Sequence, residues 1–253
     1  MEAVNRQTPN ETPTQTDKKT DETPAVSTDM TTNEPPAPSS KPVGAEPAKE
    51  DTKDLPDIPK FVMVPVEGGT FTMGQPDPNI SCEGCSSDEC PHEVTVRSFE
   101  IGKYEVTQKQ WRQVMGDNPS SFKNCDDCPV EKVSWDDVQR FLDALNARLP
   151  RGQKKYRLPT EAEWEFAARG GKGSRRYTYA GANDPGKVAW YYDNSGSKTH
   201  PVGQLAPNEL GIHDMSGNVY EWCDDTWGPY PCDTKTKKES SRRVVRGGSH
   251  GLR

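Results

Sequence analysis

The aromatic residues of this chain are confined to one part of it. The 253-residue sequence contains 6 Phe, 8 Tyr and 6 Trp, and none of them precedes Phe61. Residues 1–58 are a mixture of Pro, Thr, Lys and acidic residues, which cannot bury enough apolar surface to offset the entropy of ordering. The sequence therefore predicts a disordered tail or linker over residues 1–58 and a folded domain over residues 59–253.

Charge and hydropathy argue against a nucleic-acid ligand and against a transmembrane segment. The formal net charge is −7 and no basic stripe with interleaved aromatic residues is present, so we expect no nucleic-acid ligand. The mean hydropathy of −0.97 and the lack of a long apolar run predict no transmembrane segment. Residues 1–10 contain no apolar segment typical of a signal peptide. The tail nonetheless resembles a lipoprotein spacer, which favours a periplasmic or extracellular location in a bacterial cell envelope.

Four of the seven cysteines form two C-x-x-C pairs, Cys82/Cys85 and Cys125/Cys128. Two such pairs are typical of a structural zinc site if they meet in space. They lie, however, in loops rich in acidic residues, Gly and Ser, where disulfides formed in an oxidising compartment are the simpler expectation. We favour disulfides and keep zinc as the alternative. The odd number of cysteines leaves at least one thiol unpaired.

The first part of the folded region has the pattern of β-strands. Residues 61–66 and 70–73 flank Gly68 and Gly69, which predicts a hairpin with a Gly-Gly turn. Pro65 identifies the first of these strands as an edge strand, because proline cannot donate to a neighbour. Alternating apolar residues predict a further strand region over residues 92–105.

Three helix starts are marked by capping residues. Thr107, Ser134 and Thr160 precede helical patterns, and those at Thr107 and Thr160 are capping boxes. The apolar face of the second helix is formed by Val138, Phe141, Leu142, Leu145 and Leu149. Pro150 ends that helix, and Gly170-Gly171 ends the third. The chain beyond is mostly loop. The pattern predicts an α+β fold with two main helices, short antiparallel strands and a loop-rich second half.

Six motifs occur in an order that resembles the formylglycine-generating-enzyme (sulfatase-modifying factor) family. They are VPVEGGTFTMG at residues 64–74, EVT at 105–107, PVEKVSW at 129–135, RLPTEAEWEFAAR at 157–169, the segment 208–222 ending in DMSGNVYEW, and RGGS at 246–249. They extend over almost the whole folded region. The resemblance implies that family's variant of the C-type-lectin fold.

The resemblance also bears on catalysis. The oxidase of this family uses two cysteines that hold copper, the first of them three positions after the Ser of its Gly-Gly-Ser motif. Leu252 occupies that position here, and the second cysteine would lie beyond Arg253. We therefore expect no catalytic residue and no copper.

The expected function is a non-catalytic binding domain with a protein or peptide ligand. The alternative is an oxidase that converts a sulfatase Cys or Ser to formylglycine. Because the family continues beyond this point, we expect a chain truncated at its C-terminus or a natural short form.

A calcium site is the second feature that the resemblance implies. Asp214, Gly217, Val219 and Glu221 fall on family calcium positions, with two side chains and the carbonyls of Gly217 and Val219 as ligands. Ca²⁺ prefers six to eight hard oxygen ligands, so this donor set suits it. A second family calcium site near residues 191–195 is not matched here.

The remaining polar and aromatic residues have simpler interpretations. Glu163 is explained by capping, and we expect Arg157 to pair with a carboxylate inside the fold. The four histidines, which show no metal-ligand spacing, are His92, His200, His213 and His250. Three tryptophans are expected in the core: Trp135, Trp164 and Trp222.

Overall fold

The computed structural model describes residues 5–6, 58–74, 91–228, 230 and 240–252. These residues all belong to one compact unit formed by residues 1–8 and 55–253. Most of the expected tail and the cysteines at positions 82, 85, 90 and 232 lie outside the described residues. No helix in the described part of the chain is long and apolar enough to cross a bilayer.

The folded part begins with two extended segments that run antiparallel to each other, residues 63–73 and residues 92–102, which we call the two arms. The strands are β2 (Met63–Val66), β3 (Gly69–Met73), β4 (His92–Val96) and β5 (Phe99–Gly102). β2 pairs with β5 and β3 pairs with β4, in one continuous register that places Val66 opposite Phe99 and Gly69 opposite Val96. The predicted hairpin is therefore wrong, because β2 and β3 are successive parts of the same arm.

Gly68 explains why the chain kinks at this point without reversing. Its N–H donates to the Ser98 hydroxyl at 3.1 Å. A Cβ atom on Gly68 would lie 2.4 Å from the Val96 carbonyl oxygen, so only glycine permits the two arms to approach here. The two glycines thus serve a close contact between strands and not a turn.

Two very short strands complete the sheet next to β5. β1 (Asn5–Arg6) pairs with β5 and with β6 (Tyr156–Arg157), giving the order β2-β5-β1-β6. β2 is an edge strand, as Pro65 predicts. Residues 5–6 form a strand in the segment predicted to be disordered, and Ile58 packs against the core. Backbone pairing to two neighbours orders residues 5–6 although they contribute no apolar run.

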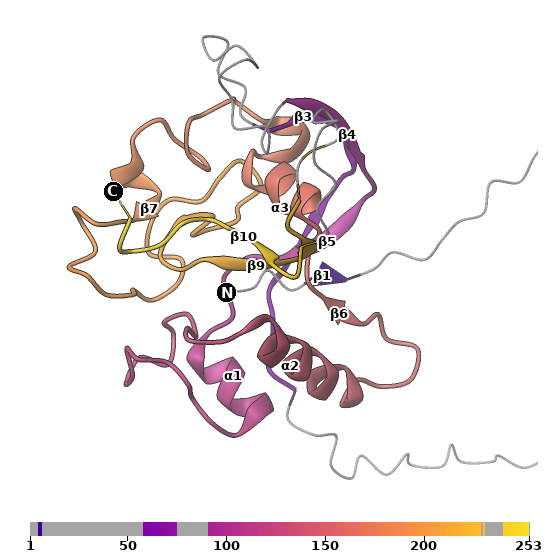
Figure 1. The fold of residues 1–253 in the computed structure, drawn as a ribbon, viewed down its shortest axis with the longest axis vertical. Coiled ribbons are helices and arrows are strands. Elements are labelled where there is room, and N and C mark those ends of the chain that lie inside the picture. Colours follow the sequence, from indigo (N-terminus) through magenta and orange to yellow (C-terminus); the bar gives the residue numbers. More distant parts are fainter. Residues whose placement is uncertain (1–4, 7–57, 75–90, 229, 231–239, 253) are drawn as a thin grey trace, which may run out of the picture. The chain divides into compact units, whose positions relative to one another are not determined.

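All three predicted helices are present (Figure 1), and their starts are confirmed by the capping residues. The helices are α1 (Gln108–Met115), α2 (Trp135–Ala147) and α3 (Glu161–Ala168). Each begins with a reciprocal capping box, in which the Thr107, Ser134 or Thr160 side chain accepts from the third helical residue. α1 and α2 pack together, and the Trp111 and Phe141 rings stack with centroids 4.9 Å apart.

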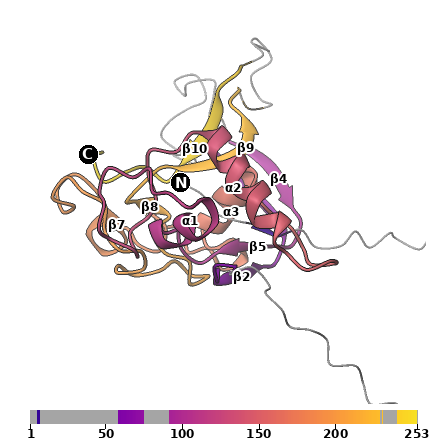
Figure 2. The same cartoon turned by 90° about the horizontal axis from the view of Figure 1, so that it is seen from below.

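The second half of the domain consists mainly of loops, as expected. It contains two 3₁₀ turns (Gly171–Gly173 and Pro185–Lys187) and the strands β7 (Ala189–Trp190), β8 (Ser216–Gly217), β9 (Glu221–Thr226) and β10 (Arg243–Arg246). β9 and β10 are antiparallel, whereas β7 and β8 pair in parallel, which differs from the expected antiparallel strands. Figure 2 shows β9 and β10 projecting together from the domain.

Two large apolar clusters form most of the core, and Met73 and Tyr230 form a third, small one. One of the large clusters lies between α1, α2 and β6, and the other lies between α3, the ribbon of β2 to β5, and β9 with β10. Trp164 is buried in the second cluster, as predicted. Trp135 and Trp222 are only partly buried and pack on the outside of the first cluster. Part of each of these two tryptophans is therefore accessible at the surface of the domain.

One of the two C-x-x-C pairs lies in the described part of the chain, and it is a disulfide. The Cys125 and Cys128 sulfurs are 2.01 Å apart, so neither is a thiolate that could bind zinc. Cys223 is the free cysteine among the described residues, and it is completely buried.

Candidate functional site

An apolar pocket of about 360 Å³ opens beside the last strand of the domain. Its lining residues come from the 131–133 loop, from residues 219–220 just before β9, from β9 and β10, and from the loop after β10: Glu131, Lys132, Val133, Val219, Tyr220, Trp222, Val245, Ser249 and His250. Tyr220 and Val245 remain 43% and 40% exposed, which is unusual for large apolar side chains within one small patch.

The walls of this pocket are held by contacts between distant segments. Trp222 lies opposite Val245 in the β9–β10 pair, and its indole N–H donates to the Val133 carbonyl at 3.1 Å. The Arg243 guanidinium lies 3.8 Å from the Trp135 ring centroid. These contacts tie β9 and β10 to the loop that precedes α2. The pocket is consequently preformed, as ligand sites usually are.

A tight turn at residues 217–219 lies behind the pocket. Gly217 has φ +90° and Asn218 has φ +57°, both in the left-handed region. The Asn218 amide donates to the Glu105 carboxylate at 2.7 Å, and the Val219 N–H donates to the same carboxylate at 3.2 Å. Glu105 therefore holds the turn through its side chain. The sequence does not single out this role, because 113 residues separate Glu105 from Asn218.

Three buried carboxylates lie close to this turn. Glu105, Asp214 and Glu221 are each at most 3% exposed. Burial and the neighbouring charges of Asp214 and Glu221 raise the pKa of Glu105 well above its usual value. Burial also raises the pKa of Asp214, although the Gly203 N–H, which donates to it at 2.7 Å, opposes this shift. A nearby cation would relieve this mutual repulsion.

Two of the four expected calcium ligands, those of Val219 and Glu221, lie close to Gly247. The Glu221 carboxylate and the Val219 carbonyl both lie 3.6 Å from the point where a Cβ of Gly247 would sit. Within the described ranges, no three His, Cys, Asp or Glu side chains are grouped closely enough to hold a metal by themselves. An ion here would need main-chain carbonyls as well, which is the donor set expected for calcium.

Leu252 lies just after the turn that carries Ser249. Its side chain is 46% exposed, and its backbone carbonyl accepts from the Tyr192 N–H at 2.9 Å. The position is therefore ordered and reachable from solvent. The free thiol of Cys223 is buried elsewhere in the core, and burial together with the Glu221 and Glu161 charges raises its pKa well above the usual value.

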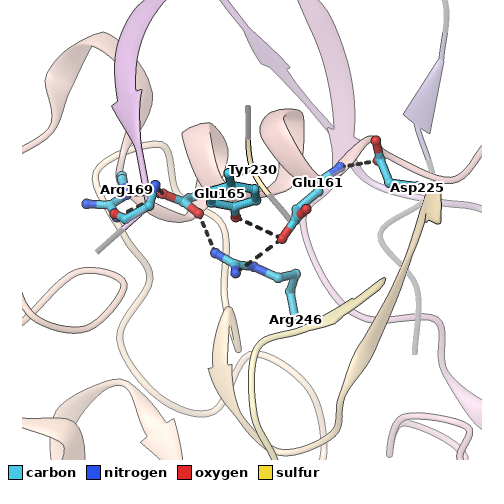
Figure 3. A network of polar contacts seen from close by, with 7 residues as sticks. Glu161, Glu165, Arg169, Asp225, Tyr230 and Arg246 are labelled. Atoms are coloured by element: carbon cyan, nitrogen blue, oxygen red, sulfur yellow. Dashed lines mark hydrogen bonds and ion pairs between the residues drawn. The ribbon is translucent and has the colours of Figure 1, made fainter. Parts of the chain in front are cut away.

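A network of charged side chains fixes α3 to β10 (Figure 3). The Arg246 guanidinium lies between two carboxylates, 2.5 Å from Glu165 and 3.4 Å from Glu161. Glu165 also accepts from Arg169, and the Tyr230 hydroxyl donates to Glu161. Burial raises the pKa of Glu161 although Arg246 and Tyr230 oppose the shift. This network anchors the strand that leads into residues 247–249.

The other polar predictions have clear outcomes. Arg157 makes a two-pronged ion pair with Glu163 at 2.7 and 2.8 Å, and Glu163 completes the capping box of α3. Both expectations are confirmed. His250 contributes to the pocket, a role that its sequence context does not signal. The ring of His250 contacts Phe122 and the Asn218 carbonyl, and His200 stacks on Trp190 at 3.8 Å.

The sequence of this chain is similar to those of several known proteins. Residues 48–252 match the sulfatase-modifying factor enzyme 1-like domain. The chain is 38% identical over 233 residues to a protein of Paenibacillus barcinonensis named chaperone protein LppX, covering 74% of this chain and 77% of that one. It is 34% identical to the formylglycine-generating enzyme of Streptomyces coelicolor, covering 57% of this chain and about half (49%) of the enzyme.

The fold is also similar to a solved structure. Treponema denticola variable protein 1 superimposes with a TM-score of 0.63 at 30% sequence identity, covering 76% of this chain and 84% of that protein. These likenesses agree with the six motifs and with the mixture of helices and short strands. The chain therefore belongs to the formylglycine-generating-enzyme family of sulfatase-modifying factor domains.

Proposed function

We propose that this domain is a non-catalytic member of the family that binds a protein or peptide ligand at the apolar pocket beside β10. The observation that carries the proposal is the exposed hydrocarbon side chain of Leu252, which stands where the family's oxidase has its first copper-holding cysteine. A leucine side chain has no metal-binding atom. The thiol of Cys223 does not replace it, because this thiol is buried in the core.

The chemistry of the pocket suits an apolar segment of polypeptide. Apolar side chains dominate its lining, and the indole of Trp222 is fixed by its hydrogen bond to Val133. A rigid aromatic side chain loses little entropy when it contacts a ligand, and such residues often dominate binding energy. The name of the Paenibacillus relative, a chaperone, supports a role in contacting other polypeptides without chemistry.

Calcium is part of the proposal as a structural ion. Asp214, Glu221 and the carbonyls of Gly217 and Val219 would hold it, and it would neutralise the buried acidic group that includes Glu105. In this position the ion would stabilise the turn behind the pocket. We propose no role for it in a reaction, and we do not expect copper.

Two broader assignments accompany this function. We propose that the fold is the C-type-lectin variant implied by the family motifs and that the protein resides in the cell envelope. The disulfide between Cys125 and Cys128 supports the second assignment, because such bonds persist in oxidising compartments.

The binding proposal is tested by charging the pocket. Val245→Lys places a charge among apolar lining residues, and its control Val62→Lys changes another exposed valine, 57% accessible, that does not line the pocket. We expect the wild type and Val62→Lys to suppress aggregation of reduced insulin B chain, measured by light scattering. Val245→Lys should need at least about ten times more protein for the same effect.

The competing activity needs a separate measurement. The protein is incubated with Cu(I) and a Cys-containing sulfatase peptide, and the mass of the peptide is followed. Appearance of the aldehyde would establish the oxidase alternative and reject a non-catalytic domain. Equal suppression of aggregation by Val245→Lys and Val62→Lys would reject the pocket as the binding site.

A further inference from the structure

Strand β3 has a strand partner on only one of its two edges. It pairs with β4 in a two-stranded sheet, and within the described residues no strand lies on its other side. An unpaired edge presents main-chain N–H and C=O groups that can bind another extended chain. In this domain residues 69–72 of β3 line a large cleft, and Thr70 and Thr72 are exposed there.

The register identifies the main-chain groups on that edge. In an antiparallel pair, these groups point alternately toward the partner strand and away from it. The Gly74 N–H, one residue beyond the end of β3, is not used for pairing with β4, because it donates to the Glu165 carboxylate of α3 at 2.9 Å. Counting back by two and four residues, we assign the N–H and C=O groups of Thr72 and Thr70 to the outer edge of β3.

The side chains give independent support for this alternation. The Thr70 and Thr95 hydroxyl oxygens are 2.8 Å apart across the strand pair. Side chains come this close at positions where the two residues do not exchange main-chain hydrogen bonds. The contact between Thr70 and Thr95 therefore favours outward main-chain groups at Thr70, in agreement with the assignment made from Gly74.

At its end, the edge is already bound by side chains that mimic a neighbouring strand. Glu165 accepts from the Gly74 N–H, and Arg169 donates to the Gly74 carbonyl at 2.6 Å. Both are anchored through the network that includes Arg246 (Figure 3). No comparable cap from the described residues covers the outer main-chain groups of Thr70 and Thr72. The edge is thus closed at one end and open along the cleft.

The cleft has the volume and lining that an extended peptide needs. It measures about 1120 Å³ and shares no lining residue with the apolar pocket beside β10. Residues 69–72 of β3 form one wall, and the loop that carries Tyr177 and Tyr179 forms another. The packed rings of Phe71 and Phe166, 5.2 Å apart, offer an apolar contact within it.

The charges near this edge favour an acidic ligand. Lys172 and Arg176 line the cleft with exposed side chains. The ion pair of Lys172 is with exposed Glu67, and such surface pairs are weak enough to be exchanged. The acidic lining residues are placed differently: Glu165 is engaged by two arginines, Glu209 accepts from the Arg175 N–H, and Glu93 lies on β4.

We infer that β3 is a second binding site, at which an extended acidic segment of another protein adds a strand along Thr70 and Thr72. Its main chain exchanges hydrogen bonds with the outer groups of these two residues. Its apolar side chains contact Phe71 and Phe166, and its carboxylates face Lys172 and Arg176. This site is separate from the pocket of the proposed function and does not depend on it.

The test uses two proline variants that differ only in the edge they block. Thr70→Pro removes an outward N–H from the β3 edge, whereas Thr95→Pro removes the corresponding N–H from the opposite edge, on β4. Both lose the same hydroxyl hydrogen bond, so their stabilities should be similar. Proline is tolerated on edge strands where the lost N–H faces away from the partner strand.

The probe is a fluorescently labelled, end-blocked heptapeptide of alternating Val and Glu, and its binding is measured by anisotropy. We expect Thr70→Pro to weaken binding at least tenfold and Thr95→Pro to change it less than twofold. In the wild type, the peptide should slow amide hydrogen exchange at Thr70 and Thr72.

Variants of the peptide keep the test decisive even if Thr70→Pro fails to fold. Methylation of alternate peptide nitrogens should abolish binding to the wild type, because it removes the N–H groups that pair with β3. A peptide of alternating Val and Lys should bind at least tenfold more weakly. Unchanged binding of the methylated peptide, equal binding of the Lys peptide, or no binding of the Glu peptide would each overturn the inference. Concentration-dependent protection of Thr70 without peptide would identify a second copy of this chain as the occupant and overturn it too.

Discussion

Among single residues, those of the turn behind the pocket carry the strictest requirements. Gly217 combines a positive φ of +90° with a close approach to Trp190, whose carbonyl oxygen would lie 2.4 Å from an added Cβ. Asn218 follows at φ +57°, and its side chain joins Glu105 to the His200 backbone. Both residues belong to one of the recognisable sequence motifs, and the structure supplies the reason: their backbone shape positions Val219 and Glu221.

Gly217→Ala should destabilise the domain by about 3 kcal/mol or more, because the new methyl group adds a clash to the cost of a positive φ. Gly152→Ala is the matched control, since Gly152 has φ +85° but nothing lies within 4 Å of its Cβ position. That variant should lose only about 1 kcal/mol. Urea unfolding in the presence of chelator measures both. Equal losses would mean that the approach to Trp190 has no energetic consequence.

At the level of elements, α3 connects more parts of the molecule than its eight residues suggest. Glu163 closes the capping box and binds Arg157, while Glu161 and Glu165, four residues apart and thus on one face, hold Arg246 of β10. Glu165 also binds Gly74 at the end of β3. One helix therefore joins the β2–β5 ribbon to the strand that builds the pocket.

Glu165→Gln should cost roughly 3–5 kcal/mol of unfolding free energy, because it leaves the Arg246 charge, which is largely buried, without its closest carboxylate. The control is Glu67→Gln, which breaks an exposed ion pair with Lys172 and should cost less than about 1 kcal/mol. Thermal and urea unfolding of both variants at neutral pH provide the comparison. A loss at Glu165 no larger than at Glu67 would contradict the view that this network fixes α3 to β10.

For the whole molecule, the buried carboxylates set how stability depends on pH. The pKa values of Glu105 and Asp214 are raised above their ordinary values of 4.5 and 3.8. The folded state then binds more protons than the unfolded state above these values, so these two groups lower stability as the pH rises. Glu163 has the opposite sign, because Arg157 and the Thr160 N–H lower its pKa despite burial. Its contribution is present above pH 4.5 and is lost as the pH falls further.

Bound calcium should offset the loss of stability that Glu105 and Asp214 cause as the pH rises. At neutral pH, and at about 100 times its dissociation constant, it should raise the melting temperature by roughly 5–10 °C relative to chelator. At acidic pH the increase should shrink, because burial raises the pKa of Asp214 and a protonated carboxyl does not bind the ion.

Substitution of one expected ligand provides the control for this measurement. Glu221→Gln should remove the calcium effect, whereas Glu93→Gln, at an exposed position, should retain it. A calcium response that is independent of pH, or that persists in Glu221→Gln, would rule out this site.

The sequence alone determined the features whose causes are local. Each helix start depends on a capping residue and the side chain three positions later, so Thr107, Ser134 and Thr160 could be read directly. The motif order likewise identified the family, and the pairing of Arg157 spans only six residues. Only the tertiary structure decided that β2 pairs with β5 and β3 pairs with β4. The Gly-Gly segment looks like a turn until Gly68 is seen against Val96, and the bond between Gly74 at the end of β3 and Glu165 joins residues 91 positions apart. Such contacts depend on how distant segments fold back on one another, and no short stretch of sequence contains that information.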